Sequence, residues 1–327
     1  MPAKPARRDP KKKPAALMAG DIVGIVAPAS PVHREPFEAG CETLRRMGYK
    51  PFFLPSIFEE DLYFAGSAER RVQELEEMFA RPEVKAIVCA RGGYGSNHLL
   101  PILNIKKIAK TPKIFVGYSD NTSLLTWFAD EANLMSFHGP MIAKDFAVAD
   151  GIELVSWKAA TSGQQNWSVP CDGVTMLCPG SGEGTLSGGC LSIVVASLGT
   201  PYEIKTADTI LFIEDINAKP FQIDRMLMQL KLAGKLEGVR GVIFGEMLNC
   251  AGDSQQLQCL HEGIRRIFAD PKIPVVFGLR SGHVSSGNIT LPLGVRARLV
   301  AEREVALTIL EPACTPRDEA LAAGKRK

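Results

Sequence analysis

The stretch "KIFVGYSDNTSLL" at residues 113–125 passes from an apolar segment through a short polar turn into a second apolar segment. Residues 114–117 are typical of a buried strand, and Leu124 and Leu125 begin the apolar face of a helix. Ser119 therefore stands where a strand turns sharply into a helix. At that position a serine serves either as a helix cap or as a nucleophile held at the strand tip.

Segments of the same kind surround this turn and predict the fold class. Three of the four predicted strands in the first half of the chain are followed by a segment predicted to be a helix, and the strand at 85–90 is followed by a glycine-rich segment. Strands that alternate with helices favour a parallel sheet covered on both faces, which makes this an α/β protein. The strands are expected at 22–27, 51–54, 85–90 and 114–117, and the helices at 33–47, from Ser67, and after Ser119.

The second half repeats the alternation after a more polar segment at 145–172, which we interpret as a linker. The last predicted strands, within 288–310, are short and antiparallel. We therefore expect an N-terminal parallel-sheet domain with flanking helices and a C-terminal mixed α/β domain. The predicted boundaries are a basic disordered tail at 1–19, the two domains at 20–144 and 173–312, and a flexible tail at 313–327.

Composition excludes several classes of protein. Residues 1–13 hold six Lys or Arg and one Asp, while the whole chain has a net charge of only +2, so the remainder is mildly acidic. A mildly acidic body does not indicate a nucleic-acid-binding surface. No apolar run reaches the roughly 18 residues that a membrane span needs. The apolar run after the basic start is interrupted at Asp21, which disfavours a signal peptide. We therefore expect a cytoplasmic protein.

The cysteines give no sign of a disulfide framework or a zinc site. None of the eight forms a CxxC pair, and most lie in apolar segments. Buried free thiols in a reducing compartment are the expected state.

A serine nucleophile needs a base, usually a histidine oriented by a carboxylate. Of the five histidines, His283 is the strongest candidate, since its Gly- and Ser-rich loop follows the apolar strand at 274–278. Loops beyond strand ends carry the reactive groups of parallel-sheet proteins. His138 also follows a strand, with a structural hydrogen bond as the alternative. His33, His98 and His261 are weaker candidates on predicted helices.

Glu214 is the preferred candidate for the carboxylate, because it ends the apolar strand in "TILFIED". An ionised carboxylate at the end of a buried strand is unusual unless it forms an ion pair or hydrogen bonds there. The alternative interpretation is that Glu214 is a solvent-exposed acid at the strand end. Asp120, Asp215 and Glu246 are the other carboxylates considered.

The glycine-rich "ARGGYGS" at 90–96 follows another predicted strand. It matches neither of the common phosphate-binding glycine motifs, so a nucleotide cradle is disfavoured. The preferred interpretation is an oxyanion loop beside Ser119, with backbone N–H groups facing the substrate. Arg91 is suited to hold a terminal carboxylate, and a surface arginine on a tight turn is the alternative.

Several separated motifs, in order, resemble the LD-carboxypeptidase family of serine peptidases, which includes muramoyltetrapeptide carboxypeptidases and microcin C immunity proteins. The resemblance runs from about Gly20 to Leu310. The motifs that carry it are "GDIVGIVAPAS", "ARGGYGS", "GYSDNT", "FHGPM", "GTLSGGCLSIVVASLGTPYE", "LFIEDIN" and "GHVSSGNITLPLG".

This resemblance implies a triad of Ser119, Glu214 and His283, with the serine in the N-terminal domain, the other two in the C-terminal domain, and the site between them. It implies oxyanion donors at the Asp120 N–H and at one of Gly92 or Gly93. It also implies no cofactor and no metal, and a homodimer.

The function implied is release of the terminal D-alanine from an L,D-linked murein tetrapeptide during peptidoglycan recycling, with a muropeptide as the only expected partner besides a second copy of the chain. Two alternatives stay open. An immunity-type peptidase acting on peptidyl-nucleotide antibiotics needs aromatic residues to stack on a base, and Trp157 and Trp167 are the candidates. A non-catalytic muropeptide-binding protein would use the same cleft without hydrolysis.

Overall fold

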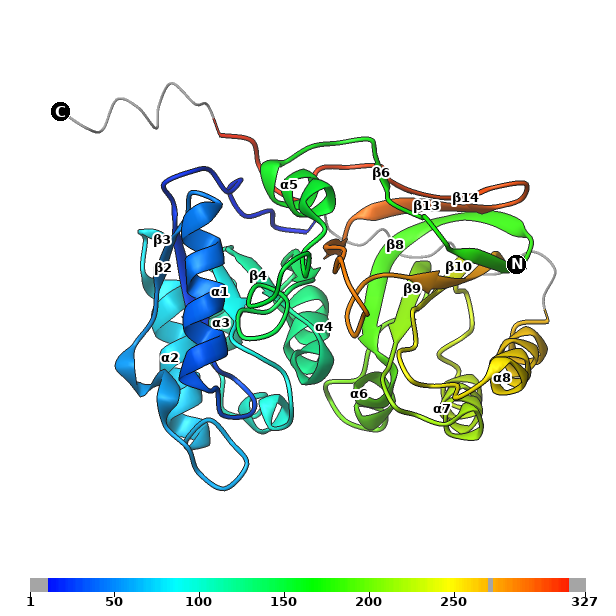
Figure 1. Cartoon of the computed structure of the whole chain (residues 1–327), viewed down its shortest axis with the longest axis horizontal. Helices are drawn as coiled ribbons and strands as arrows, with labels where there is room; N and C mark the ends of the chain where they lie inside the picture. The colour runs from blue at the N-terminus through cyan, green and yellow to red at the C-terminus, as the bar shows by residue number, and fades with distance from the viewer. Residues whose placement is uncertain (1–10, 270–272, 318–327) are drawn as a thin grey trace.

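The computed structural model describes residues 11–269 and 273–317, and two sheets organise these residues (Figure 1). The first sheet has six strands in the order β12-β5-β4-β3-β1-β2. All neighbouring pairs are parallel except β12 and β5, which run antiparallel. The strands are β1 Ile22–Val26, β2 Lys50–Phe52, β3 Val84–Cys89, β4 Ile114–Gly117, β5 Ser136–His138 and β12 Leu291–Leu293.

The helices of this first unit follow the predicted pattern. The α1 helix buries Phe37, Cys41 and Leu44, as its periodicity predicts. The Ser67 side chain caps α2 by accepting a hydrogen bond from the Arg70 N–H at 3.2 Å. The helices are α1 Arg34–Arg46, α2 Ala68–Ala80, α3 Ile105–Ile108 and α4 Thr122–Asp130, with short 3₁₀ turns η1 Pro55–Phe58, η2 Ser96–Leu99 and η3 Ser119–Asn121.

The second sheet has eight strands in the order β6-β14-β13-β8-β9-β10-β11-β7. The four central strands from β8 to β11 are parallel, and the outer pairs are antiparallel. The strands are β6 Trp167–Val169, β7 Thr175–Cys178, β8 Gly180–Cys190, β9 Thr209–Glu214, β10 Gly241–Gly245, β11 Val275–Leu279, β13 Arg296–Ala301 and β14 Val305–Ile309. The mixed α/β architecture predicted from the sequence is therefore confirmed.

Four further helices accompany the second half of the chain: α5 Leu154–Ser162, α6 Leu191–Ala196, α7 Pro220–Leu232 and α8 Ser254–Ile267. Figure 1 shows α6, α7 and α8 together along one face of the second sheet. Gly234 follows α7 with φ = 71°, the left-handed conformation that a glycine helix end adopts. No helix within the described residues is both long enough and apolar enough to span a bilayer.

The two units share strands and core. The strand β12 comes from the second half of the chain but pairs with β5, so it completes the first sheet. The segment predicted as a linker holds α5 and β6, and β6 pairs with β14 of the second sheet. One hydrophobic cluster runs from the first sheet to Phe212, Ile243 and Leu299 of the second. The predicted boundaries at 144 and 172 stay predictions, but the contacts between the halves are extensive.

Both ends of the described chain pack on the folded body. Leu17 is buried and its N–H donates to the Thr161 carbonyl at 2.9 Å. Thr315 donates from its N–H to the Pro14 carbonyl at 2.7 Å. The prediction of a disordered tail through residue 19 thus differs from the structure at 11–19, since "AALM" finds apolar and backbone partners. Residues 1–10 and 318–327 of the two predicted tails lie outside the described residues.

Candidate active site

The residues singled out in the sequence follow the carboxyl ends of parallel strands from both sheets, the edge at which α/β proteins bind ligands. Ser119 follows β4, Glu214 ends β9, and His283 follows β11. Ser119 and His283 line one cavity of about 430 Å³, together with the predicted Arg91, Gly92 and Gly93.

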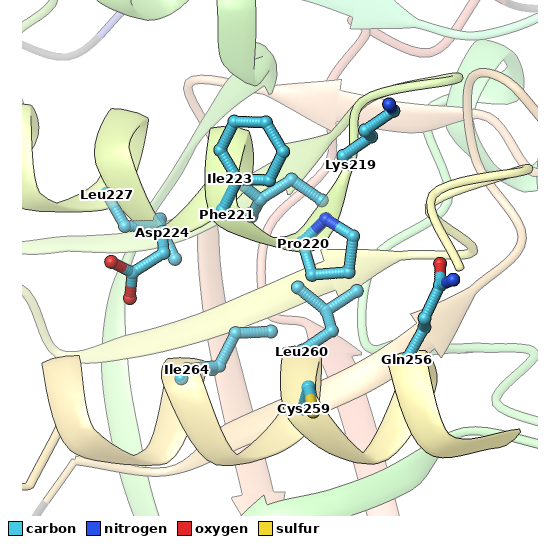
Figure 2. Close-up of a pocket in the computed structure, with 11 residues that line it drawn as sticks. Lys219, Pro220, Phe221, Ile223, Asp224, Leu227, Gln256, Cys259, Leu260 and Ile264 are labelled. Carbon is cyan, nitrogen blue, oxygen red and sulfur yellow. The ribbon is translucent and has the colours of Figure 1, made fainter. Parts of the chain in front are cut away.

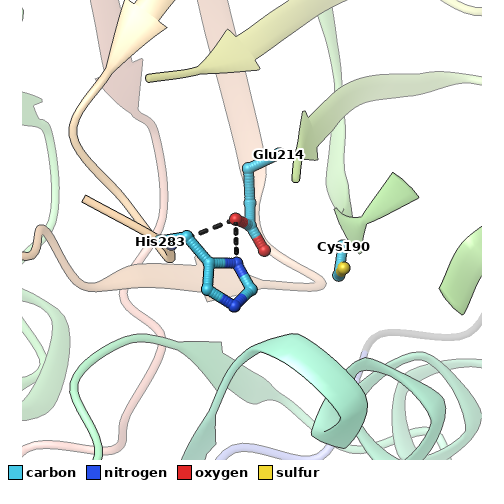
Figure 3. Close-up of side chains that lie close together, drawn as sticks. All are labelled: Cys190, Glu214 and His283. Carbon is cyan, nitrogen blue, oxygen red and sulfur yellow. Dashed lines mark hydrogen bonds and ion pairs between the residues drawn. The ribbon is translucent and has the colours of Figure 1, made fainter. Parts of the chain in front are cut away.

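Glu214 and His283 form a close pair (Figure 3). The His283 Nδ1 lies 2.7 Å from the Glu214 Oε2, and the His283 backbone N–H donates to the same oxygen at 3.0 Å. The Nε2 atom is on the far side of the ring from Glu214. The carboxylate thus fixes the ring with Nε2 free to exchange a proton with a substrate-side group.

Glu214 is ionised although it is fully buried. Burial alone would raise the pKa of its carboxyl group, but the polar interactions of His138 and His283 with the carboxylate outweigh burial and lower that pKa to about 2. The pair therefore has the electrostatic arrangement needed to stabilise an imidazolium at His283.

Ser119 is held in a strained turn. Its φ of 61° lies in the left-handed region, which a non-glycine residue rarely adopts. A Cβ atom at Gly117 would stand 3.0 Å from the Cys89 sulfur and 3.2 Å from the Asn121 Cβ, so a larger residue behind the serine would press on both neighbours. Such strain is typical of a nucleophile at a strand–helix junction.

A capping role for Ser119 is excluded. The N-cap residues of η3 and α4 are Tyr118 and Asn121, so Ser119 is not an N-cap residue. Neither the Tyr118 nor the Asn121 side chain accepts a capping hydrogen bond. Among the described residues, Ser119 also makes no hydrogen bond to His283, although both line the cavity. Hydrogen bonds between a nucleophile and its base are often loose without substrate and tighten when substrate binds.

The glycine loop lies directly against the serine. A Cβ atom at Gly92 would stand 2.7 Å from the Ser119 Cβ, and Gly93 has a φ of 113°. The loop is fixed to the serine turn because the Ser96 N–H donates to the Asp120 carboxylate at 2.7 Å and the Ser96 hydroxyl donates to the Asp120 carbonyl at 2.6 Å. Backbone N–H groups are therefore held rigidly beside Ser119.

The cavity is lined by cationic side chains without a carboxylate among its lining residues. Arg91 is half-buried, and its guanidinium donates to the Pro31 carbonyl at 3.2 Å. Lys144 and His33 are exposed on the same cavity. This charge pattern favours an anionic ligand. Lys144 was not predicted from the sequence, in which its only signal was its place three residues after the "FHGPM" motif.

His138 is brought to the same carboxylate, although the sequence ranked it below His283. Its Nε2 lies 3.7 Å from the Glu214 Oε1, and both side chains are fully buried. Its position at the end of β5 was the signal that pointed toward this site.

A metal site at these residues is disfavoured by the chemistry of the donor atoms. Cys190, Glu214 and His283 place possible ligand atoms within 4.8 Å of one another (Figure 3). However, burial and then the charges of Glu214 and Asp215 raise the pKa of the Cys190 thiol, whereas metal binding needs a thiolate. The His283 Nδ1 and the Glu214 Oε2 are already bonded to each other. All eight cysteines are free, and five of them are buried.

Two other cavities differ in their relation to this site. One of about 560 Å³ lies between α7 and α8 (Figure 2) and is lined by neither serine nor histidine. Another of about 610 Å³ shares Pro36, Ala143 and Lys144 with the cavity of Ser119, so the two cavities adjoin.

Comparisons with known proteins identify the family to which this chain is similar. The family model described as the LD-carboxypeptidase N-terminal domain matches residues 23–139, and that of the C-terminal domain matches residues 183–299. A Bacillus subtilis protein named "Probable murein peptide carboxypeptidase" is 36% identical over 299 residues, which cover 90% of this chain and 93% of the relative.

Solved structures with the same fold come from both branches of the resemblance. The muramoyltetrapeptide carboxypeptidase from Oxalobacter formigenes superposes with a TM-score of 0.78 at 30% identity, covering 90% of this chain and 100% of that one. A microcin C7 self-immunity protein in complex with aspartyl sulfamoyl adenosine superposes with a TM-score of 0.83 at 26% identity, covering 93% of this chain and 100% of that one.

Proposed function

This chain belongs to the LD-carboxypeptidase family, and we propose that it is a serine carboxypeptidase that releases the terminal D-alanine from an L,D-linked murein tetrapeptide. The observation that carries the proposal is the strained Ser119 in one cavity with His283, whose Nδ1 is held by the ionised Glu214.

The reaction follows from this arrangement. The Ser119 hydroxyl attacks the scissile carbonyl while its proton passes to the His283 Nε2, and Glu214 stabilises the imidazolium that forms. The backbone N–H groups of Asp120 and of Gly92 or Gly93 donate hydrogen bonds to the negative oxygen of the tetrahedral intermediate. The proton on His283 then passes to the leaving amino group, and water hydrolyses the acyl-enzyme by the same route.

The charge of the cavity supports a substrate with a free C-terminus. Arg91 and Lys144 supply positive charge, and none of the residues lining the cavity is acidic. A guanidinium binds a carboxylate through two parallel hydrogen bonds, which fixes the orientation of the terminal residue. The relative named as a murein peptide carboxypeptidase supports murein peptide as the source of that C-terminus.

The two tryptophans considered for the immunity-type alternative do not support it. Trp157 is fully buried and packs edge-on against Phe146, with ring centroids 5.3 Å apart. Trp167 is 5% exposed and lies in the same hydrophobic cluster. Neither ring is placed to stack on a nucleotide base. Backbone strain at Ser119 is compatible with the non-catalytic alternative too, because ligand clamps also hold strained residues, so a measurement of turnover has to separate the two.

The test is hydrolysis of three substrates by the purified chain: murein tetrapeptide, its L-Ala-terminated isomer, and a peptidyl-adenylate analogue. We expect release of D-alanine from the first alone, and loss of that activity in Ser119→Ala. Ser123→Ala, an alteration on the adjacent helix, serves as the matched control and should keep activity. Hydrolysis of the adenylate alone would select the immunity function, and tight binding of tetrapeptide without turnover would select the binding protein.

Two further properties belong to the same proposal. A role in recycling murein peptides places the enzyme in the cytoplasm, and the family resemblance implies a homodimer. Light scattering on the purified chain checks the oligomeric state, and fractionation of cells that express the full chain checks the location.

A further inference from the structure

The second oxygen of the Glu214 carboxylate faces a histidine that the proposed reaction does not use. Whereas Oε2 accepts both hydrogen bonds from His283, Oε1 has no hydrogen-bond partner and no access to solvent. The His138 Nε2 lies 3.7 Å away and is likewise buried without a hydrogen-bond partner. This separation is longer than a hydrogen bond but within the range of an ion pair.

The hydrogen bonds at the Nδ1 side of the His138 ring limit where its protons can be. The His138 Nδ1 lies 3.1 Å from the Ser281 hydroxyl oxygen, and that hydroxyl lies 2.8 Å from the Ile289 carbonyl oxygen. A hydroxyl has one proton, and the carbonyl can only accept it. When Ser281 donates to Ile289, its oxygen is left to accept a proton from the His138 Nδ1.

The three protonation states of the His138 ring differ in which neighbouring polar groups they leave without a suitable partner. A neutral ring protonated at Nδ1 turns a lone pair of Nε2 toward the Glu214 carboxylate. A neutral ring protonated at Nε2 takes the Ser281 proton and leaves the buried Ile289 carbonyl without it. Only the ring protonated at both nitrogens keeps the hydrogen bonds to Ser281 and Ile289 and also turns an N–H group with positive charge, rather than a lone pair, toward the Glu214 Oε1.

We propose, on the basis of the function proposed above, that His138 is a cationic positioning residue that holds the second oxygen of Glu214 and balances its charge. His138 belongs to β5 of the first sheet, whereas Glu214 and Ser281 belong to the second half of the chain. The contact therefore also fixes the catalytic carboxylate relative to the sheet that carries Ser119.

The groups packed around His138 leave Glu214 as its counter-ion. The Phe212 ring of β9 contacts it edge-on at a centroid distance of 4.9 Å, and Leu291 of β12 is its strand partner. The Tyr118 ring of β4 lies 5.9 Å away, and burial raises the pKa of that phenol, which keeps it neutral.

The remaining titratable groups are one step farther out, beyond the partners of His138. His283 and the Cys190 thiol lie near Glu214, and burial raises the pKa of Cys190. Asp145 lies behind Tyr118, whose hydroxyl is 3.5 Å from its carboxylate.

The charge balance has a consequence for the base. An unbalanced Glu214 carboxylate would draw a proton onto His283 and remove the lone pair that Ser119 needs. With His138 cationic, the pair of His138 and Glu214 is neutral as a whole, so the net negative charge beside the His283 ring is smaller. His138 thus affects the reaction through Glu214 and His283 without touching the substrate.

The first test is the pH profile of kcat/KM for wild type, His138→Gln and His138→Phe. Removing the cation should move the acid limb of the profile to higher pH by about one unit, the usual size of the effect of a neighbouring charge. Activity should recover above that limb more fully in the Gln variant, which retains a donor. His98→Gln, at an exposed histidine outside the cavity, should leave the profile unchanged. A uniform loss at all pH values, without movement of the limb, would overturn the proposal.

The second test does not depend on hydrolysis. Nitrogen-15 NMR of the imidazoles in full-length Ser119→Ala at pH 7.5 should show one histidine with both nitrogens protonated, and His138→Gln should remove that signal. Shifts of a neutral tautomer at His138 would overturn the proposal even if the His138 variants failed to fold. If the wild type hydrolyses none of the substrates, the proposed function fails while this measurement still decides the state of His138.

Discussion

Gly92 lies so close to Ser119 that a Cβ atom at position 92 would stand 2.7 Å from the Ser119 Cβ and 3.0 Å from its hydroxyl oxygen. Gly92→Ala must therefore push the loop and the serine apart. A displacement of about 1 Å at a reacting group lowers the rate roughly 100-fold, so kcat/KM on tetrapeptide should fall by at least that factor. Gly252→Ala, where the nearest atom is 3.6 Å away, is the control that should keep activity. Equal kcat/KM values for the two variants would remove the glycine loop from the site.

The left-handed backbone at Ser119 predicts that replacing the serine by glycine stabilises the protein. Both Ser119→Ala and Ser119→Gly remove the nucleophile and should be inactive. Only glycine relieves the strain at φ = 61°, so the Gly variant should be more stable than the Ala variant by about 1 kcal/mol. Urea unfolding followed by circular dichroism measures the difference. A Gly variant less stable than the Ala variant would show that the turn is not strained.

The sequence was sufficient to predict Ser119, Glu214 and His283 as candidates because each stands at the end of an apolar strand, a pattern that is local in the chain. The α/β architecture was predictable for the same reason, since strand and helix periodicities are read within short windows. The family resemblance then raised these residues above their alternatives.

Contacts between distant segments were not predictable. The pairing of β12 with β5 depends on a three-residue strand whose partner lies about 150 positions earlier, and no local pattern encodes that choice. The contact of His138 with Glu214 follows from that arrangement. Lys144 is exposed and carries no periodicity, and residues 11–19 resemble a disordered tail until their partners at Thr161 and Thr315 are known.

Asp145 should make the stability of the wild type depend on pH. Burial raises the pKa of its carboxyl group from the usual 3.8 to about 6. The folded state therefore binds this proton more tightly than the unfolded state, and this contribution to stability is present below pH 3.8 and is lost as the pH rises to 6. Asp145→Asn lacks the ionisation, so its stability relative to wild type should improve by on the order of 2 kcal/mol between pH 4 and pH 7. Denaturation at both pH values measures this change, and a constant difference would contradict it.

Metal chelation should not affect the reaction, because the proposed steps use only protein groups. We expect unchanged kcat/KM after dialysis against EDTA, with a zinc-reconstituted sample as the control. Cys190→Ala should also remain active, since its thiol is protonated and takes no part in proton transfer. Loss of activity on dialysis that zinc restores would contradict the serine mechanism. Loss in the Cys190 variant would give that thiol a role.

Substrate choice is the sharpest test of the cationic cavity. We predict hydrolysis of a tetrapeptide that ends in a free D-alanine, and poor turnover of the L-alanine isomer and of both C-terminal amides. Inverting the terminal residue exchanges the directions of its methyl group and carboxylate. A site that fixes the carboxylate then misplaces the scissile carbonyl, and an error of about 1 Å lowers the rate roughly 100-fold. The measurement is kcat/KM on the four peptides with wild type, and comparable values on all four would defeat the prediction.

Three variants identify which cation holds the carboxylate. Arg91→Ala should lose most of the preference for the acid over the amide. Arg91→Lys keeps the charge but loses the planar fork, so it should restore the preference only in part. Lys144→Ala tests the other cation of the cavity, which is exposed and therefore screened by solvent. It should lower kcat/KM less than Arg91→Ala does. If the acid preference survives in Arg91→Ala and is lost in Lys144→Ala, the anchor is Lys144, and the terminal carboxylate then lies toward the adjoining cavity that Lys144 also lines.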